Sequence, residues 1–132
     1  MNLFFLEEGN MQEDQDSAIA AEIIALEHSA LDRWYNGDPG RYQELMAPSL
    51  SYFDPWIPAR LDGQQAVQDY MQPIVGQVFA DRYDMLNPRV QVHGETAILT
   101  FNLITCNREE DATEKMLEKW NAVEVYTRIE GS

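Results

Sequence analysis

The spacing of hydrophobic residues along this chain changes near residue 81. Before that point apolar residues recur every three or four positions, a pattern typical of amphipathic helices. After it apolar and polar residues alternate, which is typical of strands with one buried face. The order of the two patterns predicts an α+β fold in which helices pack on one side of a curved antiparallel sheet.

Three helices are expected before the change of period. The first is marked by apolar residues at helical spacing: Ile19, Ile23, Leu26, Ala30 and Trp34. It should stop at Gly37, since glycine commonly follows a helix C-terminus. The second should open at Asp38, a helix-capping residue followed by proline, and end before Pro48. The third should begin near Asp62 and lose a hydrogen bond at Pro73.

Three strands are expected after it, over residues 83–92, 96–106 and 115–129. In the middle strand one face is apolar and should be buried: Ala97, Leu99, Phe101 and Leu103. The other face carries Ile98, Ile104 and Cys106, which makes it too apolar to leave in water. We therefore expect a homodimer that pairs through the outer sheet face.

The first sixteen residues differ from the rest of the chain. They are polar and acidic after Leu6, so residues 1–16 are expected to form a flexible leader. Residues 17–132 are expected to form a single domain, because a chain of this length with 45% apolar residues can build one core.

The chain is strongly acidic, with 23 acidic residues against 9 basic ones and a net charge of −14. This charge argues against nucleic acid and anionic membranes as partners, because phosphates need Lys and Arg. No apolar run approaches the ~20 residues of a membrane helix. The segment Met1–Leu6 lacks the basic flank of a signal peptide, so a cytoplasmic location is expected.

Asp54 is the main candidate for chemistry. It follows the β-type pair Tyr52 and Phe53 and precedes Pro55, which places it at the end of a strand. Leu50, Tyr52 and Asp54 share a face that is otherwise suited to burial, and an acid in such a place is a candidate general base. The alternative is a turn acid that accepts hydrogen bonds from nearby backbone N–H groups. The sequence leaves both interpretations open.

Four motifs are informative through their order along the chain: Gly37-Asp38-Pro39, Ser51-Tyr52-Phe53-Asp54-Pro55, Leu61-Asp62-Gly63 and Trp120-Asn121-Ala122-Val123-Glu124-Val125-Tyr126. Together they resemble the nuclear transport factor 2-like superfamily, and most of all its SnoaL-like branch. That branch is related to ketosteroid isomerases and to the association domain of calcium/calmodulin-dependent kinase. The resemblance covers roughly residues 18–131. It implies a cystatin-like cone of about three helices wrapped by a bent sheet, with a pocket at its wide end.

The resemblance also implies a role for Asp54, which falls on the proton-shuttling aspartate of ketosteroid isomerases. The other two members of that site do not carry over. Their helix tyrosine falls at Ala30, and their protonated aspartate falls at or beside Val125. Glu124 is one residue off and is expected to face the other way. Without these donors a developing enolate is not stabilised, so steroid isomerisation is not expected.

The predicted function is the binding of a small apolar molecule in an aromatic pocket with Asp54 at its mouth. Residues predicted to line this pocket are Trp34, Tyr52, Trp56, Met71, Trp120 and Asn121. One alternative is a cofactor-free isomerase or lyase that uses Asp54 as its base. A second alternative is an oligomerisation module similar to the kinase association domain.

No metal or cofactor is expected. Neither His28 nor His93 has a second histidine at ligand spacing, and no glycine-rich phosphate loop occurs. The resemblance further implies a final strand, containing Trp and a His-x-His motif, after Glu130. The sequence ends at Ser132, so either the chain is cut short or the sheet lacks that strand.

Overall fold

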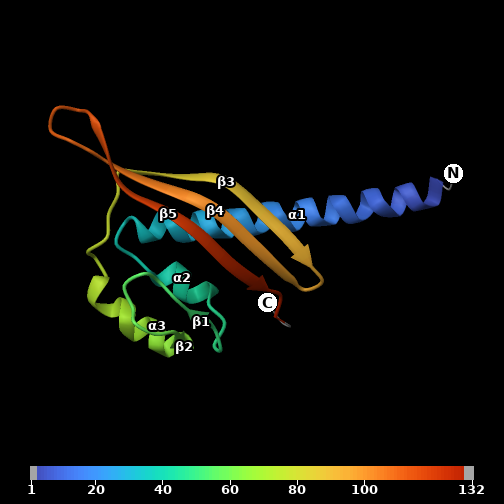
Figure 1. The fold of residues 1–132 in the computed structure, drawn as a ribbon, viewed down its shortest axis with the longest axis horizontal. Coiled ribbons are helices and arrows are strands. Elements are labelled where there is room, and N and C mark those ends of the chain that lie inside the picture. Colours follow the sequence, from blue (N-terminus) through green and yellow to red (C-terminus); the bar gives the residue numbers. More distant parts are fainter. Residues whose placement is uncertain (1–2, 130–132) are drawn as a thin grey trace. The chain divides into compact units, whose positions relative to one another are not determined.

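A computed structural model of the chain describes residues 3–129, with side chains from residue 11 onward. Three helices precede three long antiparallel strands, which confirms the predicted α+β fold (Figure 1). The chain divides into two compact units. We call Met1–Glu27 with Asp81–Ser132 the sheet unit, and His28–Ala80 the insert unit. None of the helices in the described residues is long and apolar enough to cross a membrane.

The first helix, α1, is longer than the hydrophobic pattern predicts. It spans Leu3–Trp34, so the backbone is helical within the segment expected to be a leader. The spacing of apolar residues located only the part from Ile19 onward, because the preceding turns are polar. The flexibility of residues 1–16 and the single domain over residues 17–132 stay predictions.

The sheet unit contains three strands in the order β3-β4-β5, each antiparallel to its neighbour. They are β3 (Arg82–His93), β4 (Thr96–Arg108) and β5 (Glu114–Thr127). The turn between β3 and β4 contains Gly94 with φ of 62°, a conformation that glycine adopts readily. The register shifts once in each strand pair: between Leu86 and Arg89 where β3 pairs with β4, and between Thr105 and Cys106 where β4 pairs with β5.

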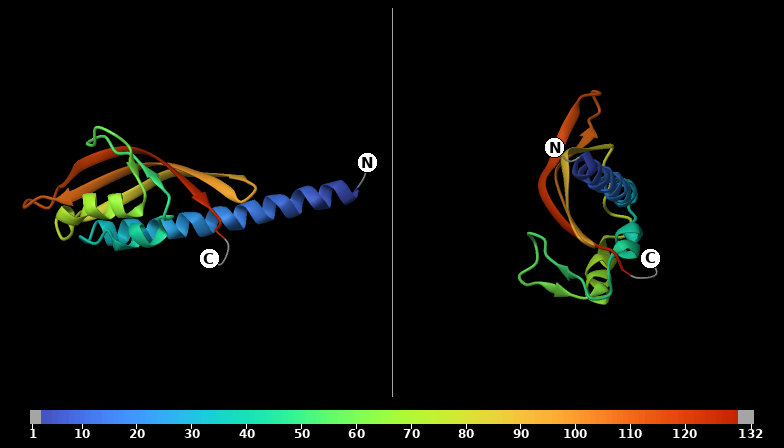
Figure 2. Two further views of the ribbon diagram at one scale, coloured as in Figure 1. Left: turned by 90° about the horizontal axis from the view of Figure 1, so that it is seen from below. Right: turned by 90° about the vertical axis from the view of Figure 1, so that its right-hand side faces the viewer.

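One face of this sheet, the inner face, lies along α1 (Figure 2). The inner residues of β4 are those predicted to be buried, and their exposure is at most 5%: Ala97, Leu99, Phe101 and Leu103. From α1, Ile23 and Glu27 are buried too. The alternation along β4 therefore predicted its buried face correctly.

The opposite side, the outer face, carries Ile98 and Ile104 of β4 with Val123 and Val125 of β5. Cys106 was predicted to share this face, and its regular pairing with β3, in step with that of Ile104, agrees with the prediction. Cys106 is nevertheless only 7% exposed, and Arg82 Nη2 donates to its Sγ at 3.5 Å. The register shift next to it adds its extra residue, Leu117, to β5 and leaves the alternation of β4 intact.

The insert unit contains short elements. After the end of α1 they are α2 (Gly40–Leu45), β1 (Ser51–Tyr52), β2 (Leu61–Asp62), α3 (Gln64–Met71) and a 3-10 turn (Gln72–Ile74). Strands β1 and β2 pair antiparallel. Its buried apolar residues are Ala30, Leu31, Tyr35, Val67 and Met71. Pro73 lies in the 3-10 turn, so α3 ends where proline removes a helical hydrogen bond.

The C-terminus of α1 ends in a Schellman motif, as the sequence predicts from Gly37. The N–H of Asp38 donates to the carbonyl of Arg33 at 2.9 Å, and the N–H of Gly37 donates to that of Trp34 at 3.1 Å. Gly37 has φ of 84°, as this motif requires. The helix carbonyls are thereby satisfied before the chain turns towards α2.

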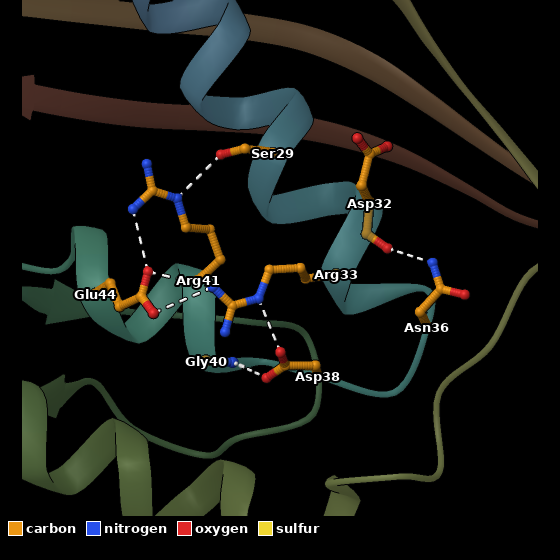
Figure 3. Close-up of polar contacts among 8 residues, drawn as sticks. All are labelled: Ser29, Asp32, Arg33, Asn36, Asp38, Gly40, Arg41 and Glu44. Carbon is orange, nitrogen blue, oxygen red and sulfur yellow. Dashed lines mark hydrogen bonds and ion pairs between the residues drawn. The ribbon is translucent and has the colours of Figure 1, made fainter.

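Arg33 and its partners join the end of α1 to α2 (Figure 3). Arg33 Nε donates to Asp38 Oδ2 at 2.8 Å, and its Nη1 donates to Glu44 Oε1 at 3.1 Å. Asp38 Oδ1 accepts the backbone N–H of Gly40 at 2.8 Å, but the N-cap of α2 is Pro39, one residue after the cap predicted at Asp38. Arg41 pairs with Glu44 at 3.1 Å, so one acid serves two guanidinium groups.

The insert unit is closed at its base by backbone hydrogen bonds. The N–H of Gly76 donates to the carbonyl of Gly37 at 2.8 Å, and the N–H of Ala80 donates to that of Tyr35 at 3.2 Å. A Cβ atom added to Gly37 would lie 2.8 Å from Phe79 Cζ, so this position has no room for a larger residue. The chain enters and leaves the unit at one place.

Candidate functional site

Asp54 lies in the loop between β1 and β2, just beyond the strand end predicted for it. Its carboxylate accepts four hydrogen bonds. Oδ1 accepts the backbone N–H groups of Trp56 and Ile57 at 2.9 and 3.2 Å. Oδ2 accepts the hydroxyls of Tyr52 and Tyr70 at 3.1 and 2.6 Å. The rings of these two tyrosines lie 6.1 Å apart, so they hold the carboxylate from one strand and one helix.

These bonds limit the chemistry available to Asp54. A carboxylate has about four lone-pair positions, and here the turn and the two tyrosines use all of them. The bond to Asp54, followed by burial and the Asp54 charge, raises the pKa of Tyr70 to about 12. Tyr70 therefore stays a hydrogen-bond donor across the neutral range. To act as a base, Asp54 would have to release one tyrosine.

The other residues predicted to bind a ligand in the insert unit are spread out. Trp34 packs edge-on against Tyr42, with ring centroids 5.9 Å apart. Met71 is buried, whereas Trp56 leaves 67% of its surface exposed. Tyr52 contacts Asp54 through its side-chain hydroxyl, whereas Trp56 contacts Asp54 through its backbone N–H. Tyr70 of α3, to which the sequence assigned no site role, completes this group through its bond to Asp54.

Trp120 and Asn121 were predicted to line the same pocket, but they lie on opposite faces of β5. Trp120 pairs with the buried Leu103 and lies on the inner face. Asn121 lies on the outer face and accepts a hydrogen bond from Asn102 Nδ2 at 2.6 Å. Because neighbouring residues of a strand alternate in direction, one surface cannot include both.

A second polar group, which the sequence did not predict, lies on the inner face of the sheet unit. It consists of Glu27 from α1 with Glu124 and Tyr126 from β5. The Tyr126 hydroxyl donates to Glu27 Oε2 at 2.8 Å and lies 3.4 Å from Glu124 Oε2. Glu27 is fully buried. The expected outward direction of Glu124 is wrong, because its register partner is Leu99, which is also fully buried.

The inner position changes the protonation of Glu124. Burial, followed by a hydrogen bond to Glu27 and the charge of Glu27, raises the pKa of Glu124 to about 10. The same burial and acidic neighbours raise the pKa of Tyr126. Both side chains are therefore protonated at neutral pH. This group contains buried hydrogen-bond donors in the part of β5 where the sequence indicated none.

Among the side chains of residues 11–129, no three from His, Cys, Asp or Glu are grouped closely enough to hold a metal ion. The features considered below are the tyrosine-bound Asp54, the Glu27, Glu124 and Tyr126 group, and the apolar outer face.

Comparisons with known proteins place these features in context. A ketosteroid isomerase-like protein from Parabacteroides distasonis is 30% identical, with a TM-score of 0.54 over 74% of this chain and 81% of that one. The association domain of C. elegans CaMKII is 18% identical, with a TM-score of 0.74 over 90% and 92% of the two chains. The CaMKII hub homology domain of Chlamydomonas reinhardtii is 18% identical, with a TM-score of 0.67 over 86% and 89%.

The curated proteins give no match to this sequence. The family model of the calcium/calmodulin dependent protein kinase II association domain, by contrast, matches residues 19–132. These residues include all three long strands and most of the helical part. The chain therefore belongs to the calcium/calmodulin dependent protein kinase II association domain family, and it has the nuclear transport factor 2-like fold.

Proposed function

We propose that this chain is a self-association domain in which two copies pair through the outer face of the sheet. The observation that carries this proposal is the exposure of Val123 and Val125, which leave 70% and 64% of their surfaces in solvent. Ile98 lies directly beside Val125 across the strands. Covering such a surface makes the free energy of association more favourable, in proportion to the apolar area buried. Membership of a family named for association supports the same conclusion.

The charge distribution on the sheet is compatible with pairing. The chain carries a net charge of −14, which opposes the approach of two copies. On β4 and β5, however, the three central rows of the outer face contain no ionisable residue: Ile98 with Val125, Thr100 with Val123, and Asn102 with Asn121. The ionisable residue of these rows is Arg89 of the edge strand β3, beside Thr100. The β4 and β5 parts of two such faces can meet without the cost of burying an unpaired charge.

Val123→Lys is expected to convert the dimer into a monomer at micromolar concentration. The substitution buries an ammonium in each copy, which costs several kcal/mol and should raise Kd by roughly 100-fold or more. Sedimentation velocity measures the change. Val75→Lys, at an exposed valine of the insert unit, is the matched control and should behave as the wild type. A Val123→Lys protein that dimerises normally would show that this face is not the interface.

The second candidate function is binding of a small apolar molecule that carries a hydrogen-bonding group. It is favoured by the buried polar group on the inner face, in which the protonated Glu124 and Tyr126 both hydrogen-bond to Glu27 and a ligand would have to replace Glu27 as acceptor. Asp54 with Tyr52 and Tyr70 is the other candidate contact, and cofactor-free turnover with Asp54 as base remains part of this proposal. A thermal-shift screen tests it, because a ligand that binds only the folded state raises Tm. A cytoplasmic location stays a prediction from the sequence.

A further inference from the structure

The outer face of the sheet unit differs from strand to strand. Of the six outer residues of β3, four are ionisable: Arg82, Asp84, Arg89 and His93. The rows of β4 and β5 from Ile98 to Asn102 carry no ionisable residue. Because β3 is one edge of the sheet and β4 is its centre, the uncharged part of the face lies to one side, over β4 and β5.

A two-fold axis that brings two outer faces together must lie in the plane midway between the sheets, because only such an axis turns the second face towards the first. We infer that this axis runs along the strands, over the gap between β4 and β5, so that these two strands form the contact and β3 of each copy stays outside it. The strand directions of the two sheets then agree within about 30°, as in aligned sheet packing. The inference rests on the proposed self-association and names the strands that carry it.

This axis places β4 of one copy on β5 of the other and sets each row on the same row, as an isologous contact requires. Val125 of one copy lies on Ile98 of the other, and Val123 lies on Thr100. The two highly exposed valines of β5 are thereby covered by the central strand of the other sheet. The apolar rows of one copy are thus buried against the apolar rows of the other.

The row of Asn102 and Asn121 is polar, and the same axis satisfies it. Within one copy Asn102 Nδ2 donates to Asn121 Oδ1 at 2.6 Å. An amide offers an oxygen acceptor and two N–H donors, so Asn102 Oδ1 and Asn121 Nδ2 keep bonding capacity. Among the side chains of residues 11–129 neither group has a protein partner. The axis sets Asn121 of each copy on Asn102 of the other, so two further bonds close a ring of four amides.

The charges at the rim agree with this axis. Because the two sheets are offset sideways, β3 of each copy lies beyond the β5 edge of the other, and Arg89 stays in water. In the row next to the asparagines, Asp84 of one copy lies diagonally across from Lys119 of the other. The long side chain of Lys119 can reach that carboxylate while its ammonium stays hydrated.

Two other axes in the same plane fit less well. An axis directly over β4 would set β5 on β3 of the other copy, so Val123 would meet Arg89 and Asn121 would meet Leu86. The valine would then bury a guanidinium, and the amide of Asn121 would be buried without its second partner. An axis across the strands would stack β3 on β3, which takes the ionisable residues of both copies out of water.

The first test measures dimer affinity by sedimentation equilibrium. Asn121→Ala removes two symmetry-related bonds between the copies, each worth roughly fivefold in affinity, so Kd should rise by about 25-fold. Arg89→Gln should leave Kd unchanged, because that side chain stays in water. A roughly tenfold change in Kd for Arg89→Gln would place β3 in the contact and overturn the inference, as would a wild-type Kd for Asn121→Ala. If Val123→Lys has no effect on Kd, the proposed function fails as well.

The second test determines the direction of the axis with spin labels at the two ends of β5. Thr127→Cys and Met116→Cys carry the label one at a time, in a background in which the buried Cys106 is replaced by Ala. An axis along the strands keeps each label near its copy, so both separations should be about 10–20 Å for sheets ~10 Å apart. The two labelled rows, at Thr96 and Cys106 of β4, are ten residues apart. An axis across the strands reverses the rows, so at least one separation would exceed about 30 Å at ~3.4 Å per residue, and that result would overturn the inference.

Discussion

Glu124→Gln is expected to raise the free energy of unfolding at pH 8 and to remove much of its dependence on pH. In the native state the pKa of Glu124 is raised from 4.5 to about 10 by burial and by Glu27. Between these values the folded protein keeps a proton that the unfolded chain releases. The stabilisation is fully present below pH 4.5 and is lost as the pH rises towards 10, by up to about 1.4 kcal/mol per pH unit.

Glutamine keeps the shape of Glu124 and cannot ionise, so the variant does not suffer this loss. Urea denaturation at several pH values measures the effect. From pH 6 to pH 8 the stability of the variant relative to the wild type should increase by up to about 3 kcal/mol. Glu22→Gln, at an exposed acid of α1, is the control and should follow the wild type. Parallel pH profiles for Glu124→Gln and wild type would show that Glu124 is ionised in the native protein.

Asp54→Ala is expected to destabilise the protein by roughly 2–4 kcal/mol, because four hydrogen bonds to one carboxylate are lost. Asp54→Asn should cost less. Its Oδ1 can still accept the N–H groups of Trp56 and Ile57, as the turn requires. Its amide can still contact the tyrosine hydroxyls. Chemical denaturation of the two variants measures the difference.

The same variants have a second readout at Tyr70. Removing the Asp54 charge should bring the pKa of Tyr70 down from about 12 towards its usual 10, which tyrosine carbon NMR can follow. An Asp54→Ala protein as stable as the wild type would contradict the structural role. If a ligand identified by thermal shift binds the wild type and not Asp54→Asn, the carboxylate takes part in recognition. Unchanged binding would leave Asp54 as a turn acid.

Elements set by local pattern were predictable from the sequence. The helix stop at Gly37 and the start of α2 within two residues of Asp38 follow from backbone geometry and local hydrogen bonds, which involve only near neighbours. The buried face of β4 follows from strict alternation, with Leu99 at its centre. The change of period near residue 81 lies next to Arg82, where β3 begins.

The candidate site was less predictable, because it depends on register between distant segments. One strand does not reveal which of its faces is inner, so Glu124 was assigned the wrong direction until its pairing with Leu99 was known. Glu27 follows Ile23 by one helical turn, and this spacing was the only sign that it would be buried. Tyr70 on α3 reaches Asp54 across a loop, and no sequence spacing indicates that contact.

Because the insert unit is closed at its base, the number of residues in it can change without affecting the rest of the fold. Backbone bonds join Gly37 to Gly76 and Tyr35 to Ala80, so the chain returns to its starting place before β3 begins. Doubling the length of a flexible loop adds only about 0.6 kcal/mol of closure entropy. Extra residues in the exposed loop at Phe53 therefore need not disturb the strand register. That loop is a natural place to graft a peptide tag or a binding sequence.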